Sequence, residues 1–259
     1  MIPIRRGVIL PFIAVLGVSC SSSSSTSPAT TSTPLFVFAA SSLTKAFTQI
    51  GQDFHTAHPN VTVTFDFGSS TDLASQIQSE GTADVFASAS GTAMDTLQSA
   101  PGVTDRTSFA TNRLVIITPP DNPAGIASID DLAGSDLKLV LAAEGVPVGD
   151  YARQALKSAG ILAQATANVV SNEDDDASVV AKVTAGDADA AIVYTSDVAS
   201  SGSSVRSVVI PGAVNVVATY PIAVVTGSTH TDAATAFLDY VVEPTGQATL
   251  KDFGFGPAG

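Results

Sequence analysis

The feature that most constrains the fold is an apolar run that ends at two small residues and a pair of serines. Residues 35–40 have strand character, and Ser41 and Ser42 then open a segment with helical spacing to about Ile50. The same order returns where residues 61–67 alternate apolar and polar side chains and residues 68–71 open a second helix. Two successive strand-to-helix corners predict a parallel α/β sheet, which binds ligands at the carboxyl ends of its strands.

These corners also predict an anion site. The first turn of a helix has backbone N–H groups without partners and carries the positive end of the helix dipole. The hydroxyls of Ser42 and Ser70 can add to those donors, so an anion could be bound without lysine or arginine. The alternative interpretation is that the serines only cap their helices, as serines commonly do.

Four short motifs occur in a fixed order along the chain. They are FAASSL at 38–43, GSSTDL at 68–73, ADVFA at 83–87 and AIVYTSD at 191–197. Together they resemble the periplasmic molybdate-binding proteins of ABC importers, and the resemblance extends from about residue 35 to residue 256.

The resemblance implies an α/β fold of the type II periplasmic-binding-protein class. In that class each of two lobes is a mixed, mostly parallel sheet flanked by helices, and a two-strand hinge joins the lobes. Lobe I is then expected to contain residues 35–111 and 222–259, and lobe II residues 112–221.

The resemblance adds three residues to Ser42 and Ser70 as ligand-binding candidates. Val148 lies in a turn of small residues at 144–149, where only backbone N–H groups could bind an anion, and a plain tight loop is the alternative. Tyr194 ends a buried strand and would reach across the cleft, although a tyrosine there can simply pack in the core.

The third added candidate, Asp176, belongs to an acidic run at 172–178. Its backbone N–H is expected to donate to the ligand while its side chain turns away, but the related proteins usually have an apolar residue here. Aspartates also favour a first helical turn for structural reasons. A metal site is not expected, because no second cluster of acidic or histidine residues accompanies the run.

The amino terminus predicts export. Residues 1–19 combine Arg5 and Arg6 with an apolar run too short for a permanent membrane span, as in a signal peptide. Cys20 is the only cysteine, and its position predicts a lipidated residue that anchors the protein to the outer face of the cell membrane. Residues 20–34, rich in Ser, Thr and Pro, predict a disordered tether. The alternative is an ordinary cleaved secretory signal.

The charge balance excludes nucleic acid as a partner. The sequence has eleven basic and twenty-four acidic residues, which gives a net charge of −13. Removal of Arg5 and Arg6 with the signal peptide would change this net charge to −15. Such a surface repels polyanions. An anion site in this chain must therefore work through short-range hydrogen bonds from neutral groups, with the acidic residues at screened distances.

These observations predict a binding protein rather than an enzyme. The chain has no Gly-x-Ser-x-Gly elbow, P-loop or spaced dinucleotide-binding motif, and none of its three histidines falls in a corner. Neutral donors favour fully deprotonated molybdate, tungstate or sulfate over hydrogen phosphate, which needs an acceptor. The resemblance favours molybdate and tungstate, delivered as a small oxyanion to the membrane permease of an ABC importer by a monomer without a cofactor. Another oxyanion, or a two-domain enzyme acting on an anionic metabolite, is the alternative.

Overall fold

The computed structural model describes residues 32–98 and 102–258. The predicted signal peptide (1–19), Cys20 and most of the predicted tether (20–34) lie outside the described residues. The strands of the described part are β1 (Thr33–Ala40), β2 (Val61–Gly68), β3 (Val85–Ala87), β4 (Val103–Thr118), β5 (Leu139–Ala142), β6 (Val169–Glu173), β7 (Ala190–Tyr194), β8 (Arg206–Val209), β9 (Val217–Val225) and β10 (Gly256–Pro257).

Helices connect these strands. The α-helices are α1 (Thr44–Ala57), α2 (Ser70–Glu80), α3 (Gly91–Asp95), α4 (Pro147–Ser158), α5 (Leu162–Ala167), α6 (Asp176–Thr184), α7 (Thr195–Ser201), α8 (Thr231–Val242) and α9 (Pro244–Asp252). Short 3-10 turns are η1 (Ser41–Leu43), η2 (Thr96–Gln98), η3 (Ile129–Ala133) and η4 (Gly202–Ser204). In the described residues no helix is long and apolar enough to cross a membrane.

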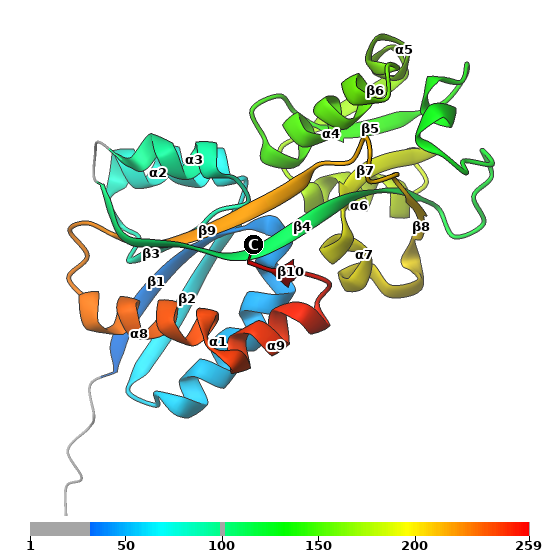
Figure 1. The fold of residues 1–259 in the computed structure, drawn as a ribbon. Helices are drawn as coiled ribbons and strands as arrows, with labels where there is room; N and C mark the ends of the chain where they lie inside the picture. The colour runs from blue at the N-terminus through cyan, green and yellow to red at the C-terminus, as the bar shows by residue number, and fades with distance from the viewer. Residues whose placement is uncertain (1–31, 99–101, 259) are drawn as a thin grey trace, which may run out of the picture. The chain divides into compact units, whose positions relative to one another are not determined.

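The strands form a sheet in the order β2-β1-β3-β9-β4-β7-β5-β6, and β8 and β10 both pair with β4. β1 pairs in parallel with β2 and β3, and β5 pairs in parallel with β6 and β7. The long strand β4 belongs to both groups, because its first part pairs with β9 and β10 and its last part with β7 and β8. Figure 1 shows β4 and β9 running together between β1–β3 and β5–β7.

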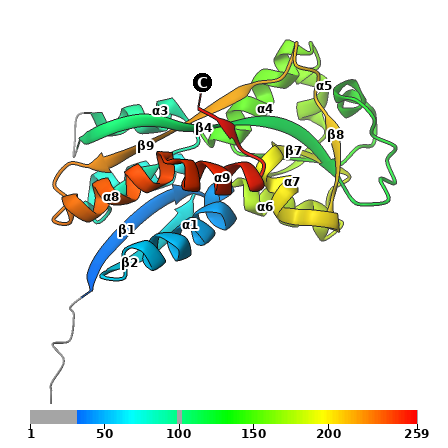
Figure 2. The same cartoon turned by 60° about the horizontal axis from the view of Figure 1, so that its bottom comes forward.

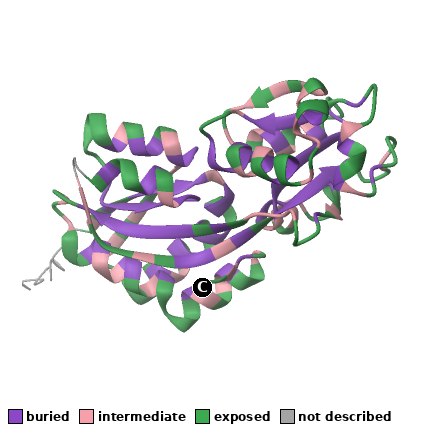
Figure 3. Cartoon of the chain, turned by 45° about the horizontal axis from the view of Figure 1, so that its top comes forward, coloured by how far each residue is buried: buried purple, intermediate pink, exposed green. Residues whose placement is uncertain are grey.

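This arrangement confirms the predicted fold class, a two-lobed α/β protein with mixed, mostly parallel sheets flanked by helices. Figure 3 shows mostly buried strands covered by helices whose outward turns are exposed. Figure 2 shows α1, α8 and α9 together on one side of the sheet, where Phe47, Phe54 and Phe237 pack edge to face. Such aromatic pairs add stability beyond that of the area they bury.

Several elements differ from the sequence-based expectation. α1 continues to Ala57, beyond the predicted helical segment that ends near Ile50. β4 begins at Val103, although its polar first half has no clear strand pattern. Strand β6 was not predicted, because it is a half-exposed edge strand that ends in Ser-Asn-Glu and so lacks a clear apolar pattern. The predicted lobe limits, 111/112 and 221/222, fall inside β4 and β9.

Candidate functional site

The two serine corners lie side by side in the sheet. β1 and β2 are parallel neighbours, and their register pairs Ala40 with Gly68, the last residue of each strand. η1 begins directly after Ala40, and α2 begins at Ser70. The parallel pairing therefore brings both helix starts to one edge of the sheet, as the sequence predicted.

All five predicted ligand-binding residues, Ser42, Ser70, Val148, Asp176 and Tyr194, line one cavity. The cavity has a volume of about 10 Å³, which is room for about one water molecule. Its other lining residues are Ala40, Ser41, Gly68, Ser69, Ala89, Val146 and Pro147. The lining has one acidic residue and no lysine, arginine or histidine, so the donors that face the cavity are neutral.

Ser42 and Ser70 are held by neighbours that leave their hydroxyl protons available. The Ser70 hydroxyl accepts a 2.9 Å hydrogen bond from the backbone N–H of Ala89. The Ser42 hydroxyl lies 2.9 Å from the hydroxyl of Tyr220. The Tyr220 oxygen accepts a hydrogen bond from the Asn112 amide, so its own O–H can donate to Ser42. Because each serine oxygen can accept from a partner on its own side, each O–H is free to donate into the cavity.

Val148 contributes its backbone through the start of α4. Pro147 is the first residue of this helix, so the N–H groups of Val148 and Gly149 are among those without a partner inside the helix. A Cβ atom at Gly149 would lie 2.3 Å from the carbonyl oxygen of Ala143. The helix start therefore packs against the end of β5 as closely as only glycine allows.

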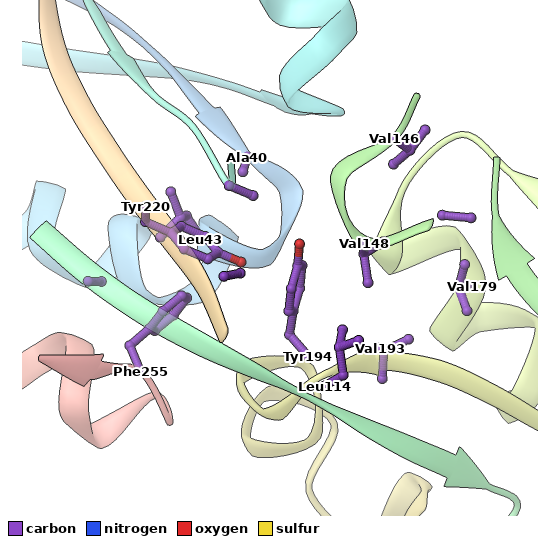
Figure 4. Packing of buried hydrophobic residues seen from close by; sticks show 14 of the residues in the cluster. Ala40, Leu43, Leu114, Val146, Val148, Val179, Val193, Tyr194, Tyr220 and Phe255 are labelled. Carbon is purple, nitrogen blue, oxygen red and sulfur yellow. The ribbon is translucent and has the colours of Figure 1, made fainter. Parts of the chain in front are cut away.

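Three buried side-chain oxygens in the described residues have no hydrogen-bond partner, and all three line this cavity. They belong to Ser69, Asp176 (Oδ2) and Tyr194. Figure 4 shows the Tyr194 ring extending from the end of β7 into the space between Val148 and Ala40. Buried polar atoms without partners are rare in folded proteins and costly. Their concentration here indicates that the site is built to receive a polar ligand.

The side chain of Asp176 does not turn away, contrary to the expectation from the family resemblance. Only 3% of the residue is exposed, and its Oδ1 is in contact with the Ser41 hydroxyl and accepts the N–H of Ala177. The cause is that α6 begins at Asp176, with Asp175 as its N-cap, so the side chain of the first helical residue faces the η1 corner.

The buried aspartates near the cavity are difficult to ionise. Burial, together with the negative charge of Asp175, raises the pKa of Asp176 to about 6. Burial and the neighbouring Asp176 raise the pKa of Asp197, which accepts the backbone N–H of Tyr194, well above its ordinary value. Burial also raises the pKa of the Tyr194 hydroxyl, so this group stays protonated and can donate.

Sequence reasoning missed Ser69 and Ser41. It chose one serine from each pair, whereas the structure places both members of both pairs around the cavity. Ser69 precedes α2 and is buried, and its position beside Ser70 in the predicted corner was the only available signal. Asp72, in contrast, is exposed and does not line the cavity.

The residues present suit an oxyanion better than a bare cation. Among residues 32–98 and 102–258, no group of three or more His, Cys, Asp or Glu side chains could bind a metal ion. The cavity instead presents hydroxyl and N–H donors, which satisfy the acceptor oxygens of an oxyanion. The expectation from the sequence is that a transition metal enters this site only as its oxyanion, with no protein atom as a direct ligand.

Comparisons with known proteins agree with this site. Residues 35–256 match the family described as bacterial extracellular solute-binding protein. The chain is 37% identical to the molybdate-binding protein ModA of Mycobacterium tuberculosis over 98% of each chain. It superimposes with a TM-score of 0.68 on the substrate-binding domain of a putative molybdenum ABC transporter from Clostridium difficile, at 27% identity over 88% of this chain and 100% of that one.

The periplasmic molybdate-binding protein of Azotobacter vinelandii shares the fold, with a TM-score of 0.75 at 20% identity over 85% of this chain and 98% of that chain. Because the family match covers the described core and the mycobacterial relative is aligned over almost its whole length, the family assignment does not depend on the fold alone. The chain therefore belongs to the bacterial extracellular solute-binding proteins.

Proposed function

We propose that the protein captures molybdate, and also tungstate, between its two lobes and delivers it to an ABC importer. The observation that carries this proposal is the single cavity lined by all five predicted residues, in which three buried polar oxygens have no partner. The relatives named as molybdate-binding proteins support the choice of anion. Membership of a solute-binding family agrees with the prediction that the chain is not an enzyme.

The donor set explains how an acidic protein can bind an anion. The hydroxyls of Ser42, Ser70 and Tyr194 and the N–H group of Val148 at the start of α4 belong to residues that line the cavity, and none of these donors carries a net charge. Hydrogen bonds to a charged partner contribute roughly 1.5–3 kcal/mol each, so a few such donors suffice for tight binding. These groups donate hydrogen bonds, and a protonated ligand would instead need an acceptor for its own proton. The donor set therefore supports a fully deprotonated tetrahedral dianion as the ligand.

Binding requires the lobes to move. A tetrahedral oxyanion is larger than the single water that the cavity of about 10 Å³ can hold. Contacts across the cleft include the Thr71 hydroxyl, which donates to the carbonyl of Gly145 at 2.6 Å, and the contact of Ser41 with Asp176. We infer that residues 35–111 with 222–259 and residues 112–221 open and close about β4 and β9, as in hinge-bending proteins.

The proposed location of the protein in the cell follows from its amino-terminal sequence. We infer that residues 1–19 are a signal peptide, that Cys20 is lipidated and that residues 20–34 tether a monomer to the outer face of the cell membrane. Such a tether would keep the two lobes close to the permease of the importer. Neither a cofactor nor nucleic acid is part of this function.

A second candidate ligand is hydrogen phosphate. Its proton requires an acceptor in the site, and the unpartnered Oδ2 of Asp176 is one. The two candidates differ in a measurable way, because sulfate and molybdate carry no proton at neutral pH.

Isothermal titration of the mature protein with molybdate, tungstate, sulfate and phosphate tests the proposal. We expect molybdate and tungstate to bind with similar affinity and sulfate and phosphate to bind at least about 100-fold more weakly, a difference of about 2.7 kcal/mol. Preference for phosphate would select the second candidate, and no binding of any of the four anions would refute both.

A further inference from the structure

The carboxyl group of Asp176 is the unusual member of the site. Its Oδ1 contacts the Ser41 hydroxyl and accepts the N–H of Ala177 at 3.1 Å, whereas its Oδ2 is buried without a partner. An ionised carboxylate only accepts hydrogen bonds, and so do the oxygens of a deprotonated oxyanion. An ionised Asp176 would therefore repel the bound ligand and leave Oδ2 unsatisfied in a cavity from which water is displaced.

A single proton removes this conflict. We propose that Asp176 is protonated in the ligand-bound state and donates a hydrogen bond from Oδ2 to an oxygen of the oxyanion, so that capture of a deprotonated anion takes up one proton from solution. No covalent bond forms or breaks except that between this proton and Oδ2. The inference rests on the proposed function and adds that oxyanion capture is linked to pH through one residue.

The surroundings of Asp176 favour its neutral form. The acidic groups that face it are Asp175 on the same turn and Asp197 on α7, and the phenols of Tyr194 and Tyr220 lie on β7 and β9. The η1 corner contributes only the neutral Ser41. Burial and the charge of Asp175 raise the pKa of Asp176 to about 6 even without a ligand, and a bound dianion adds negative charge that raises this pKa further.

The ammonium group of Lys45, a basic residue near the site, is not directed at Asp176. Lys45 lines a neighbouring cavity of about 420 Å³ together with Ala177 and Asp197. Its ammonium group contacts the carbonyl oxygen of Ser200. Lys45 is the only basic residue in the lining of that cavity, and the lining of the candidate site contains none. Arg153 donates to the carbonyl oxygens of Ala142 and Gly149 and to the Asn172 amide oxygen, and so is not directed at Asp176 either. A proton on Asp176 would therefore offset negative charge that no basic side chain among the described lining residues offsets.

The expected pH dependence follows from linkage. Above the pKa of Asp176 in the free protein, about 6, each pH unit should lower the affinity for molybdate by up to about tenfold, because one proton must be taken up. In Asp176→Asn the amide donates without titrating, so the affinity should not vary over this range. Near pH 8 the variant should therefore bind molybdate more tightly than the wild-type protein.

The experiment is isothermal titration with molybdate at several values between about pH 6.5 and pH 8.5, in buffers of different ionisation enthalpy. The matched control is Asp72→Asn, because Asp72 lies in the first turn of α2 but is exposed and outside the cavity. We expect uptake of close to one proton near pH 8 in the wild-type and Asp72→Asn proteins, and none in Asp176→Asn.

Molybdate binding without proton uptake in the wild-type protein would overturn the inference and leave the proposed function intact. Uptake that persists unchanged in Asp176→Asn would also overturn it, because another group would then carry the proton. Absence of molybdate binding throughout this pH range would instead refute the proposed function. Since proton uptake is measured on the wild-type protein, the inference remains testable even if Asp176→Asn fails to fold.

Discussion

The hydroxyl of Ser42 lies 2.9 Å from the hydroxyl of Tyr220, and the amide of Asn112 donates to that same tyrosine oxygen. Asn112 lies on β4 and Tyr220 on β9, the two strands that run between the groups of parallel strands. The hydroxyl of Ser42, a proposed ligand donor on η1, thus contacts a residue of the proposed hinge. Tyr220 is fully buried and packs edge to face against Tyr194, with ring centroids 5.9 Å apart.

We expect Tyr220→Phe to weaken molybdate binding by about three- to tenfold, less than the loss of the Ser42 hydroxyl itself. The reason is that Ser42 keeps its hydroxyl but loses the partner that orients it. Affinities of Tyr220→Phe, Ser42→Ala and the double variant should be strongly non-additive, as measured by titration. Tyr240→Phe, on α8 and outside the cavity, is the matched control. Additive effects would show that the two hydroxyls act independently.

The variant Tyr194→Phe tests whether Tyr194 donates a hydrogen bond to the ligand or only packs in the core. The Tyr194 hydroxyl is buried without a partner, so its removal should not lower the free energy of unfolding and could raise it. Affinity for molybdate should fall by about ten- to a hundredfold, because a hydrogen bond to a charged ligand is lost. Chemical denaturation and titration of the same variant measure both quantities. A variant that binds normally would exclude Tyr194 from the ligand contacts.

Two substitutions test whether the backbone N–H groups at the start of α4 bind molybdate. Gly149→Ala places a Cβ 2.3 Å from the carbonyl oxygen of Ala143, so the first turn of α4 must shift and its donors should lose alignment. We expect at least about a tenfold loss of molybdate affinity. Val148→Ala keeps the N–H in place, so its affinity should change by less than about threefold, although loss of a buried side chain lowers stability. Equal losses in both variants would indicate a role for the valine side chain.

The stability of the ligand-free protein should depend on pH through Asp176. Its pKa is about 6 in the folded chain, against an ordinary value of 3.8. A raised pKa stabilises the folded state below the unfolded value, and this stability is lost as pH rises to about 6. The loss is on the order of a few kcal/mol, since each pKa unit corresponds to about 1.4 kcal/mol.

Denaturant unfolding at about pH 4 and about pH 7.5 measures this loss. Asp176→Asn should lack the part of the decrease that Asp176 causes and should be more stable than the wild-type protein at the higher pH, whereas the part caused by the buried Asp197 should remain. Asp72→Asn serves again as the control. A wild-type pH profile that coincides with that of Asp176→Asn would show that Asp176 titrates normally in the folded protein.

The anchor requires an experiment in cells. We expect Cys20→Ala to move the protein from the membrane fraction to the soluble fraction without a change in molybdate affinity, because Cys20 is the first residue of the proposed tether and precedes all the candidate site residues in the chain. Mass spectrometry of the mature amino terminus checks the modification directly. An unmodified Cys20, or cleavage at another position, would contradict the lipoprotein assignment.

The sheet and the first two corners could be predicted because local pattern determines them. The alternation in β2 and the apolar run of β1 each end at small residues and serines, and parallel pairing then brings the two ends together. Strand β6 and the first half of β4 could not be predicted, because polar edge residues form strands there only through pairing with neighbours.

Five of the residues that line the candidate cavity could be predicted from the sequence, but the orientation of their side chains could not. Whether Asp176 faces the cavity depends on the packing of α6 against η1, a contact between residues 135 positions apart in the sequence. Which serine of each pair contributes its hydroxyl depends similarly on the exact start of α2, and no single-sequence pattern defines a helix start to one residue. Ser69 was missed for this reason.

The most direct test of the central claim is titration of Ser70→Ala with molybdate, compared with Ser75→Ala. Ser70 is buried in the cavity and its oxygen accepts from Ala89, whereas the Ser75 hydroxyl, one turn later on the same helix, is exposed and bonds only to the carbonyl of Thr71. We expect the affinity of Ser70→Ala to fall by about ten- to a hundredfold and that of Ser75→Ala to be unchanged. Wild-type affinity in Ser70→Ala would contradict the assignment of this cavity as the oxyanion site.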